Sequence, residues 1–288
     1  MKATVIIPAR MAATRFPGKP LSKILEKPMI QWVYEACSRA AIDRVIVATD
    51  SFEIVEAVKS FGGEYHVTRD DHPNGTSRIA ETAATIDSDI VINVQGDEPA
   101  IHPEDIEAVV TPLRANPALD MSTLAEPIQD PEDLFNPNVV KLVRNKAHHA
   151  MYFSRAPIPY VKHAGMHGPT FPTSPHITHY RHIGIYGYRR SFLLRYVAAE
   201  PCALEDIEGL EQLRALDMGA SIYVGLARHA SIGVDTPADL IKAERFLAAS
   251  TNQHSTGTAE AAPPPDVHIS QIPKPPAGGL SQEEGDLS

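Results

Sequence analysis

Short runs of β-branched and aliphatic residues alternate with amphipathic segments along the first 120 residues. Buried parallel strands and core-facing helices produce these two patterns. The strands predicted here are 4–7, 44–50, 64–68 and 90–94, and the helices are 29–37, 54–61, 77–86 and 104–116. Four strand–helix units in series predict an α/β fold, a doubly wound and mostly parallel sheet with helices on both faces.

The regular alternation ends near residue 120, where Pro-rich and His-rich connections separate the strand-like runs. Further strands are predicted at 121–125, 139–143, 148–153 and 182–188, and further helices at 192–199, 205–216 and 237–248. We therefore predict one domain over residues 1–249 with a small β-rich insertion at about 121–190.

Charge and proline content set the last part of the chain apart. The whole chain has 26 Lys and Arg against 36 Asp and Glu, a net charge of −10. Residues 250–288 hold one lysine, five acids and six prolines. Such a composition predicts a disordered acidic tail. A net-acidic chain also argues against nucleic acid as a partner, because phosphate neutralisation needs clustered Lys and Arg.

The cysteines and the apolar runs indicate in which cellular compartment the protein is expected. Cys37 and Cys202 are too few for a disulfide framework and lack metal-ligand spacing. The apolar run near the N-terminus ends at Pro8 and Arg10, too early for a signal peptide, and no run reaches membrane-spanning length. We expect a cytoplasmic protein with no membrane insertion.

A basic loop follows the first predicted strand, where ligands of open parallel sheets bind. Arg10, Arg15 and Lys19 lie within ten residues, and guanidinium and ammonium groups suit a polyphosphate. The loop is not a Walker motif, because Ala13 and Pro20 stand where that motif needs Gly and Ser or Thr. On its own it could instead be a solvated basic loop.

Two acidic residues lie in loops that, like the basic loop, connect predicted elements of the sheet domain. Asp97 follows the strand at 90–94, and Asp235 lies in Gly-Val-Asp-Thr-Pro before a predicted helix. Carboxylates beside phosphate-binding groups suit Mg²⁺. The alternative for Asp235 is a helix N-cap. Only the fold can bring these two residues together.

Several longer strings are specific: IIPAR, TRFPGKP, NVQGDEP, FNPNVVK, YFSRAPIP, RHIGIYGYR, LEQLR and GVDTP. Through them the chain resembles the 3-deoxy-manno-octulosonate (Kdo) cytidylyltransferases, or CMP-Kdo synthetases, over roughly residues 5–247. The resemblance implies transfer of CMP from CTP to the anomeric hydroxyl of Kdo, with release of pyrophosphate, for lipopolysaccharide biosynthesis. It also implies a homodimer, in which the insertion at about 121–190 serves sugar binding and dimerisation.

The resemblance assigns the catalytic and nucleotide-binding residues. Asp97 and Asp235 would hold Mg²⁺, and Arg10 and Lys19 would complete the catalytic set by holding the CTP phosphates. The residues implied in nucleotide binding are Arg10, Arg15, Lys19, Asn74, Gly75, Thr76, Arg78 and Gln95. The chain departs from the family at Asn74 and Ser77, where Ser and Glu are frequent.

The residues implied in binding the sugar acid are Arg155, His182, Tyr186, Glu211 and Gln212. Arg155 can bind a carboxylate with two parallel hydrogen bonds, and the others can bind hydroxyl groups. From the residues alone, Tyr186 could instead be a core residue and Glu211 an exposed helix acid. His176, His179 and His182 are spaced by threes, but without a cysteine among them we do not expect a zinc site.

Three rival functions stay open at this point. The sugar could be an amino analogue of Kdo or another sugar acid. The chain could be a catalytically inactive nucleotide-binding regulator, although such a protein needs no second metal carboxylate. The proline clusters of the tail could bind a partner as extended polyproline segments.

Overall fold

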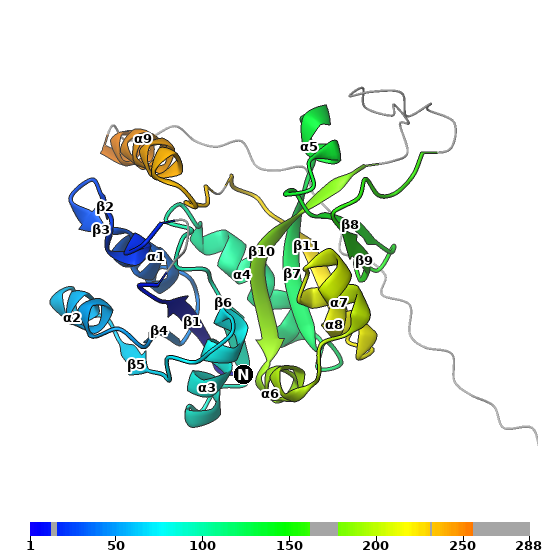
Figure 1. The fold of residues 1–288 in the computed structure, drawn as a ribbon, viewed down its shortest axis with the longest axis horizontal. Helices are drawn as coiled ribbons and strands as arrows, with labels where there is room; N and C mark the ends of the chain where they lie inside the picture. The colour runs from blue at the N-terminus through cyan, green and yellow to red at the C-terminus, as the bar shows by residue number, and fades with distance from the viewer. Residues whose placement is uncertain (13–15, 162–177, 231, 256–288) are drawn as a thin grey trace, which may run out of the picture.

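The computed structural model describes residues 1–12, 16–161, 178–230 and 232–255, the last few of them, 250–255, as backbone only. A twisted sheet in the order β11-β7-β10-β6-β1-β4-β5 runs through the molecule (Figure 1). The first half supplies β1 (Ala3–Ala9), β4 (Arg44–Thr49), β5 (Tyr65–Val67) and β6 (Ile90–Asn93), which pair in parallel as predicted. The predicted α/β class is confirmed.

The strands at the centre of the sheet are apolar on both faces because helices cover both. One face packs against α1 (Met29–Ser38), α2 (Phe52–Ser60) and α4 (Pro103–Ala115). The other face packs against α3 (Gly75–Thr85) and α6 (Arg190–Ala198). Successive residues of β1 serve the two layers, with Ile6 in one core and Ile7 in the other, and both are 0% exposed.

The β-rich insertion is smaller than predicted. Strands β7 (Met121–Pro127) and β10 (Tyr180–Arg189) belong to the central sheet, and β10 runs antiparallel between β6 and β7. Within the described part of this segment, only β8 (Lys141–Arg144) and β9 (Ala150–Ser154) form a hairpin off the main path, and the short helix α5 (Pro131–Phe135) precedes the hairpin in the chain. Hydrophobic periodicity identifies a strand but does not show which strands it pairs with. The predicted insertion therefore included two strands that belong to the central sheet.

Two predictions after residue 200 need correction. The helix predicted at 205–216 is two helices, α7 (Ala203–Glu208) and α8 (Gln212–Asp217). Gly209 lies between them with φ 61°, a left-handed conformation that ends α7. The sheet also gains an unpredicted edge strand, β11 (Ile222–Leu226), which pairs in parallel with β7.

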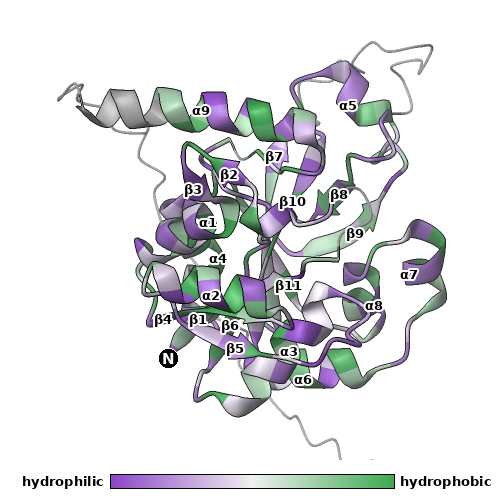
Figure 2. Ribbon diagram, turned by 60° about the vertical axis from the view of Figure 1, so that its left-hand side comes forward, coloured by the Kyte–Doolittle hydropathy of each residue, from purple (hydrophilic) through white to green (hydrophobic). Residues whose placement is uncertain are grey.

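Helix α9 (Pro237–Ser255) lies beside the small hairpin of β2 (Lys23–Ile24) and β3 (Lys27–Pro28), as both ribbon views show (Figures 1 and 2). Hydrophilic and hydrophobic residues alternate along it in Figure 2, which fits a helix with one packed face. Its apolar residues join Ile24 and Met29 in a third core cluster. This packing carries the segment before α9 towards the loop that follows β1.

The helix continues to Ser255, beyond the predicted domain boundary at 249. The rest of the predicted tail, 256–288, lies outside the described residues, so its predicted disorder stays a prediction. Among the described residues, no helix combines the length and apolarity that crossing a membrane requires.

Candidate active site

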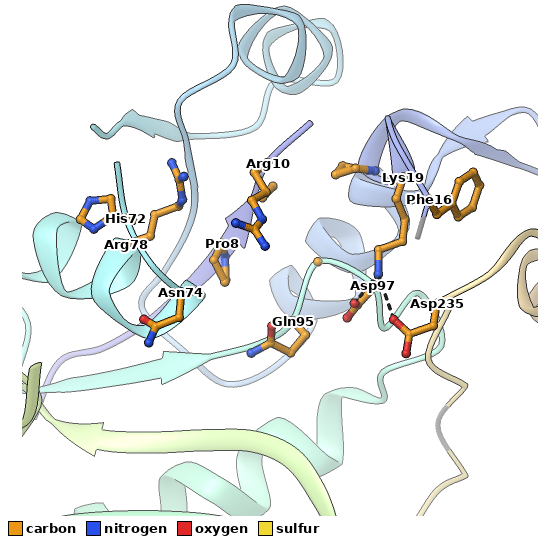
Figure 3. Close-up of a pocket in the computed structure, with 14 residues that line it drawn as sticks. Pro8, Arg10, Phe16, Lys19, His72, Asn74, Arg78, Gln95, Asp97 and Asp235 are labelled. Carbon is orange, nitrogen blue, oxygen red and sulfur yellow. Dashed lines mark hydrogen bonds and ion pairs between the residues drawn. The ribbon is translucent and has the colours of Figure 1, made fainter. Parts of the chain in front are cut away.

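A pocket of about 330 Å³ opens at the carboxyl ends of β1 and β6 (Figure 3). This is the edge at which an open parallel sheet binds ligands. In Figure 3, Lys19, Asp97 and Asp235 lie at one end of the pocket, and His72 and Arg78 at the other. The predicted residues that line it are Arg10, Lys19, Asn74, Gly75, Arg78, Gln95, Asp97 and Asp235. Arg15 lies outside the described residues.

The loop after β1 folds back on itself and presents Lys19. Gly18 adopts φ 72°, and its amide donates to the carbonyl of Met11 at 3.1 Å. The short 3₁₀ helix η1 (Lys19–Leu21) follows directly. From its first residue, the Lys19 ammonium group reaches the carboxylates of Asp97 at 2.6 Å and Asp235 at 3.5 Å.

The two predicted metal-binding acids meet although 138 positions separate residues 97 and 235. The amide of Val234 donates to the carbonyl of Asp97 at 2.9 Å, which joins the two segments directly. Gly96, just before Asp97, packs closely on the end of β1, because a Cβ atom there would lie 3.0 Å from the carbonyl oxygen of Pro8. The donor set fits a hard divalent cation, since both carboxylates already converge on one cationic group.

Helix α3 begins at the middle of the pocket. The Asn74 side chain accepts a hydrogen bond from the Ser77 amide at 2.8 Å and so caps the helix. The departure from the family at Asn74 therefore preserves a capping residue. Gly75 packs closely on β1, since a Cβ atom there would lie 3.2 Å from the Pro8 ring.

Arg78 projects from α3 and is only 3% exposed. Its guanidinium donates to Thr68 Oγ1 at 2.5 Å and to Asp50 Oδ2 at 3.0 Å. His72, buried beside it, contacts the carboxylate of Glu81. Four residues at this end of the pocket were not among the predicted site residues: Asp50, Thr68, His72 and Glu81. The rule that strand ends carry chemistry would have found Asp50, which directly follows β4.

A second pocket of about 310 Å³ adjoins the first, because Gly75 and Gln95 line both. Thr76, Tyr186, Glu211 and Gln212 line it too, and all four were predicted to bind substrate. The break between α7 and α8 places Glu211 here. Its carboxylate accepts a hydrogen bond from Thr76 Oγ1 at 2.8 Å.

Tyr186 keeps its proton in this second pocket. Burial is the main cause that raises its pKa well above the ordinary value, and the nearby Tyr196 and Glu211 add to the effect. A tyrosine in this state donates a hydrogen bond at neutral pH. The core position considered for Tyr186 and its place in the pocket are therefore compatible.

His182 and Arg155 do not line either pocket. The His182 ring packs against Phe153 and Tyr186, and its Nε2 lies 2.9 Å from Thr123 Oγ1. Arg155 donates to three backbone carbonyls, those of Pro137 at 2.8 Å, Glu208 at 2.6 Å and Gly209 at 3.3 Å. His182 thus supports Tyr186, and Arg155 holds the end of α7 that leads to Glu211.

The surroundings of His182 predict an acid-sensitive stability. Burial lowers the pKa of His182 to about 3, so the imidazole is neutral in the folded protein. An unfolded chain takes up this proton below about pH 6.5, and the contribution to the free energy of unfolding is then lost by up to about 1.4 kcal/mol per pH unit. Urea unfolding at pH 7 and pH 5 is expected to show a smaller loss for His182→Gln than for the unaltered chain. Equal losses in both proteins would contradict this prediction.

Of the three histidines considered for zinc, the two in the described part of the chain bond to different groups. His176 lies outside the described residues. His179 Nε2 is 3.1 Å from the carbonyl of Pro159, whereas His182 bonds to Thr123. The two described side chains thus have separate partners.

The sheet, the basic loop after β1 and the paired acids define a nucleotidyltransferase. The family model described as "Cytidylyltransferase" matches residues 4–222. Two similar relatives are 3-deoxy-manno-octulosonate cytidylyltransferases, from Syntrophotalea carbinolica at 49% identity and Pelobacter propionicus at 50%. The first match covers 86% of this chain and 99% of the relative, and the second 86% and 98%. The chain belongs to the 3-deoxy-manno-octulosonate cytidylyltransferase family.

Solved structures agree with this placement. CMP:2-keto-3-deoxy-manno-octonic acid synthetase complexed with CTP matches with a TM-score of 0.80 at 41% identity, over 87% of this chain and 100% of that chain. The 4-diphosphocytidyl-2C-methyl-D-erythritol synthase of Anaerococcus prevotii matches with a TM-score of 0.56 at 15% identity, over 86% and 98%. The second likeness shows the fold alone.

Proposed function

We propose that this protein transfers CMP from CTP to the anomeric hydroxyl of Kdo, giving CMP-Kdo and pyrophosphate. The product is the activated sugar for lipopolysaccharide biosynthesis. The observation that carries the proposal is the pair of pockets that share Gly75 and Gln95, one polar and rich in cationic groups, the other lined by hydroxyl, amide and carboxylate groups. Two substrates bound in them would meet at the shared wall.

The first pocket suits CTP in one orientation. Lys19 lies at the end with the paired acids, and Arg10 lies between this end and Arg78, so the triphosphate would lie along the two basic residues (Figure 3). Arg78 and the N-terminal end of α3 with Asn74 form the other end, which suits the base and ribose. The α-phosphorus would then lie near Gln95, beside the second pocket.

Asp97 and Asp235 are the residues that would hold Mg²⁺, the divalent metal proposed here for a family that generally uses one. A bound Mg²⁺ ion supplies charge neutralisation and lowers the pKa of a hydroxyl group that it polarises. The Lys19 ammonium group would lie beside the leaving pyrophosphate and neutralise its charge, and Arg10 would bind phosphate oxygens. Such transfers need positioning and charge stabilisation more than covalent catalysis.

The sugar acid would bind in the second pocket with its anomeric hydroxyl towards Gln95. Tyr186 donates a hydrogen bond, whereas Glu211 accepts one, so the two distinguish donor from acceptor groups on the sugar. Gln212 can do both. In-line attack on the α-phosphorus then needs no nucleophilic side chain.

Pyrophosphate release measured with each of the four nucleoside triphosphates and a panel of sugar acids tests this function. We expect release with CTP and Kdo only. If the enzyme preferred the amino analogue or another sugar acid, that compound and not Kdo would be its substrate. Tight CTP binding without pyrophosphate release on any sugar acid would favour the regulator instead.

Arg155→Ala is expected to raise KM for Kdo by about tenfold and leave KM for CTP within about twofold, because Arg155 holds the α7–α8 connection and not the first pocket. Loss of its three hydrogen bonds should also cost about 1–3 kcal/mol of stability. Steady-state kinetics with each substrate varied in turn measures the split. A rise confined to KM for CTP would contradict the division between the pockets.

The assembly and location follow from the same proposal. A homodimer and a cytoplasmic site, where CTP is available, are what the family implies for this enzyme. Analytical ultracentrifugation of the full chain tests the dimer. Activity of a chain that ends at residue 255 would show that the tail has no catalytic role.

A further inference from the structure

Two histidines and a glutamate from distant parts of the chain meet beside helix α4. His102 immediately precedes this helix, Glu104 is in its first turn, and His229 lies between β11 and α9. One potential metal-ligating atom from each residue lies within 4.8 Å of the others. None of the three belongs to the pockets described above for the two substrates.

The Nδ1 atoms of both imidazoles in this cluster are buried. His229 Nδ1 makes no hydrogen bond, which is rare and costly for a buried polar atom. Each Nδ1 lies near an acid: His102 Nδ1 contacts the Glu104 carboxylate, and His229 Nδ1 is 3.6 Å from Asp105 Oδ2. The two rings stack with centroids 3.6 Å apart. The arrangement brings two imidazoles and a carboxylate within reach of one common partner.

We propose that His102, Glu104 and His229 bind a transition-metal ion of the Zn²⁺ class. Two imidazoles and one carboxylate are typical ligands of such ions, whereas Mg²⁺ prefers oxygen ligands. The site therefore differs in kind from the pair of Asp97 and Asp235.

Asp105 completes the arrangement as a positioning residue. It is 3% exposed, and its Oδ1 accepts a hydrogen bond from the Arg228 amide at 2.8 Å. A carboxylate behind a histidine ligand orients the ring and raises its basicity. The stacked rings are nearly parallel, at 17°, so one must turn about its Cβ–Cγ bond for both nitrogens to face one ion. Both side chains are partly exposed, at 41% and 37%, which leaves room for this turn.

The position of the site gives it a structural role near catalysis. His102 ends the segment that begins with Asp97, and His229 begins the segment that reaches Asp235. The Val234–Asp97 hydrogen bond joins these segments at one end. A metal ion on His102 and His229 would join them at the other and hold both acids in register.

Metal binding to the untagged full chain, stripped of metals by a chelator, tests the proposal. Co²⁺ is added in the presence of millimolar Mg²⁺, which saturates hard-oxygen sites, and its visible absorption is recorded. We expect one equivalent of Co²⁺ to bind and Zn²⁺ to displace it. His102→Ala and His229→Ala should each weaken binding by at least about tenfold, and Asp105→Asn by about 10–100-fold.

The variants are expected to fold, because the His102 side chain makes no capping hydrogen bond and its carbonyl, which α4 uses, is retained. His66→Ala, which removes an imidazole from strand β5, is the matched control and should bind Co²⁺ like the unaltered chain. Circular dichroism verifies the fold of each variant. No Co²⁺ binding by the unaltered chain, or equal binding by all variants, would overturn the proposal.

Discussion

Asp97→Asn is expected to lower kcat for pyrophosphate release from CTP and Kdo on the order of 10³-fold, a magnitude typical of losing one preorganised electrostatic contact. The substitution keeps the shape of the side chain and removes its charge. That charge holds Lys19 at 2.6 Å and is one of the two carboxylates proposed to hold Mg²⁺. A coupled pyrophosphate assay at saturating substrates measures the effect.

Stability should change little in this variant, because the Asp97 side chain is about one-third exposed, at 32%, and such pairs contribute roughly 0–1 kcal/mol. Asp87→Asn is the control: Asp87 is 89% exposed, and its carboxylate pairs with Lys2 at the surface. It should keep full activity. An Asp97→Asn enzyme within threefold of the unaltered rate would remove Asp97 from the catalytic set.

Much of the fold followed from residue patterns because parallel strands covered on both faces have a simple signature. β1, β4 and β6 are largely apolar runs, and each was predicted within two residues of its observed ends. The rule that ligands bind beyond the carboxyl ends of such strands then located Arg10 and Asp97 without any structure. Both residues line the first pocket.

Pairing between distant segments could not be predicted in the same way. The alternation in 121–125 and 182–188 indicates strands, yet nothing in it shows that β10 inserts antiparallel between β6 and β7. The meeting of Asp97 with Asp235 depends on α9 packing against β2. The cluster of His102 and His229 depends on the path after β11, a strand that was not predicted.

Residue type also shows what a side chain can bind but not what it does bind. Arg155 has the geometry for a carboxylate, and the structure gives its donors to three backbone carbonyls. The sequence pattern around Glu211 is that of an exposed helix acid. In the structure, the left-handed Gly209 interrupts the helix, and Glu211 lines the second pocket. In both cases the neighbours supplied by the fold decide the role.

Lys19→Ala is expected to separate catalysis from metal binding. Turnover should fall by about 10²–10³-fold, because the Lys19 ammonium lies beside the paired acids, where the pyrophosphate is proposed to leave. Affinity for a divalent cation in the absence of nucleotide should rise instead. The Lys19 ammonium lies 2.6 and 3.5 Å from the two carboxylates and competes with a metal ion for them, so its removal leaves their charge to the ion.

Titration with Mn²⁺, followed by the paramagnetic resonance of the free ion, measures this affinity. All proteins in the titration carry His229→Ala, so that the proposed transition-metal site does not contribute. Lys23→Ala is the matched control, since this lysine is 68% exposed and pairs with Glu26. Asp97→Asn should weaken Mn²⁺ binding, the opposite of Lys19→Ala. Equal or weaker Mn²⁺ binding by Lys19→Ala would mean that Lys19 and the metal ion do not compete for the carboxylates of Asp97 and Asp235.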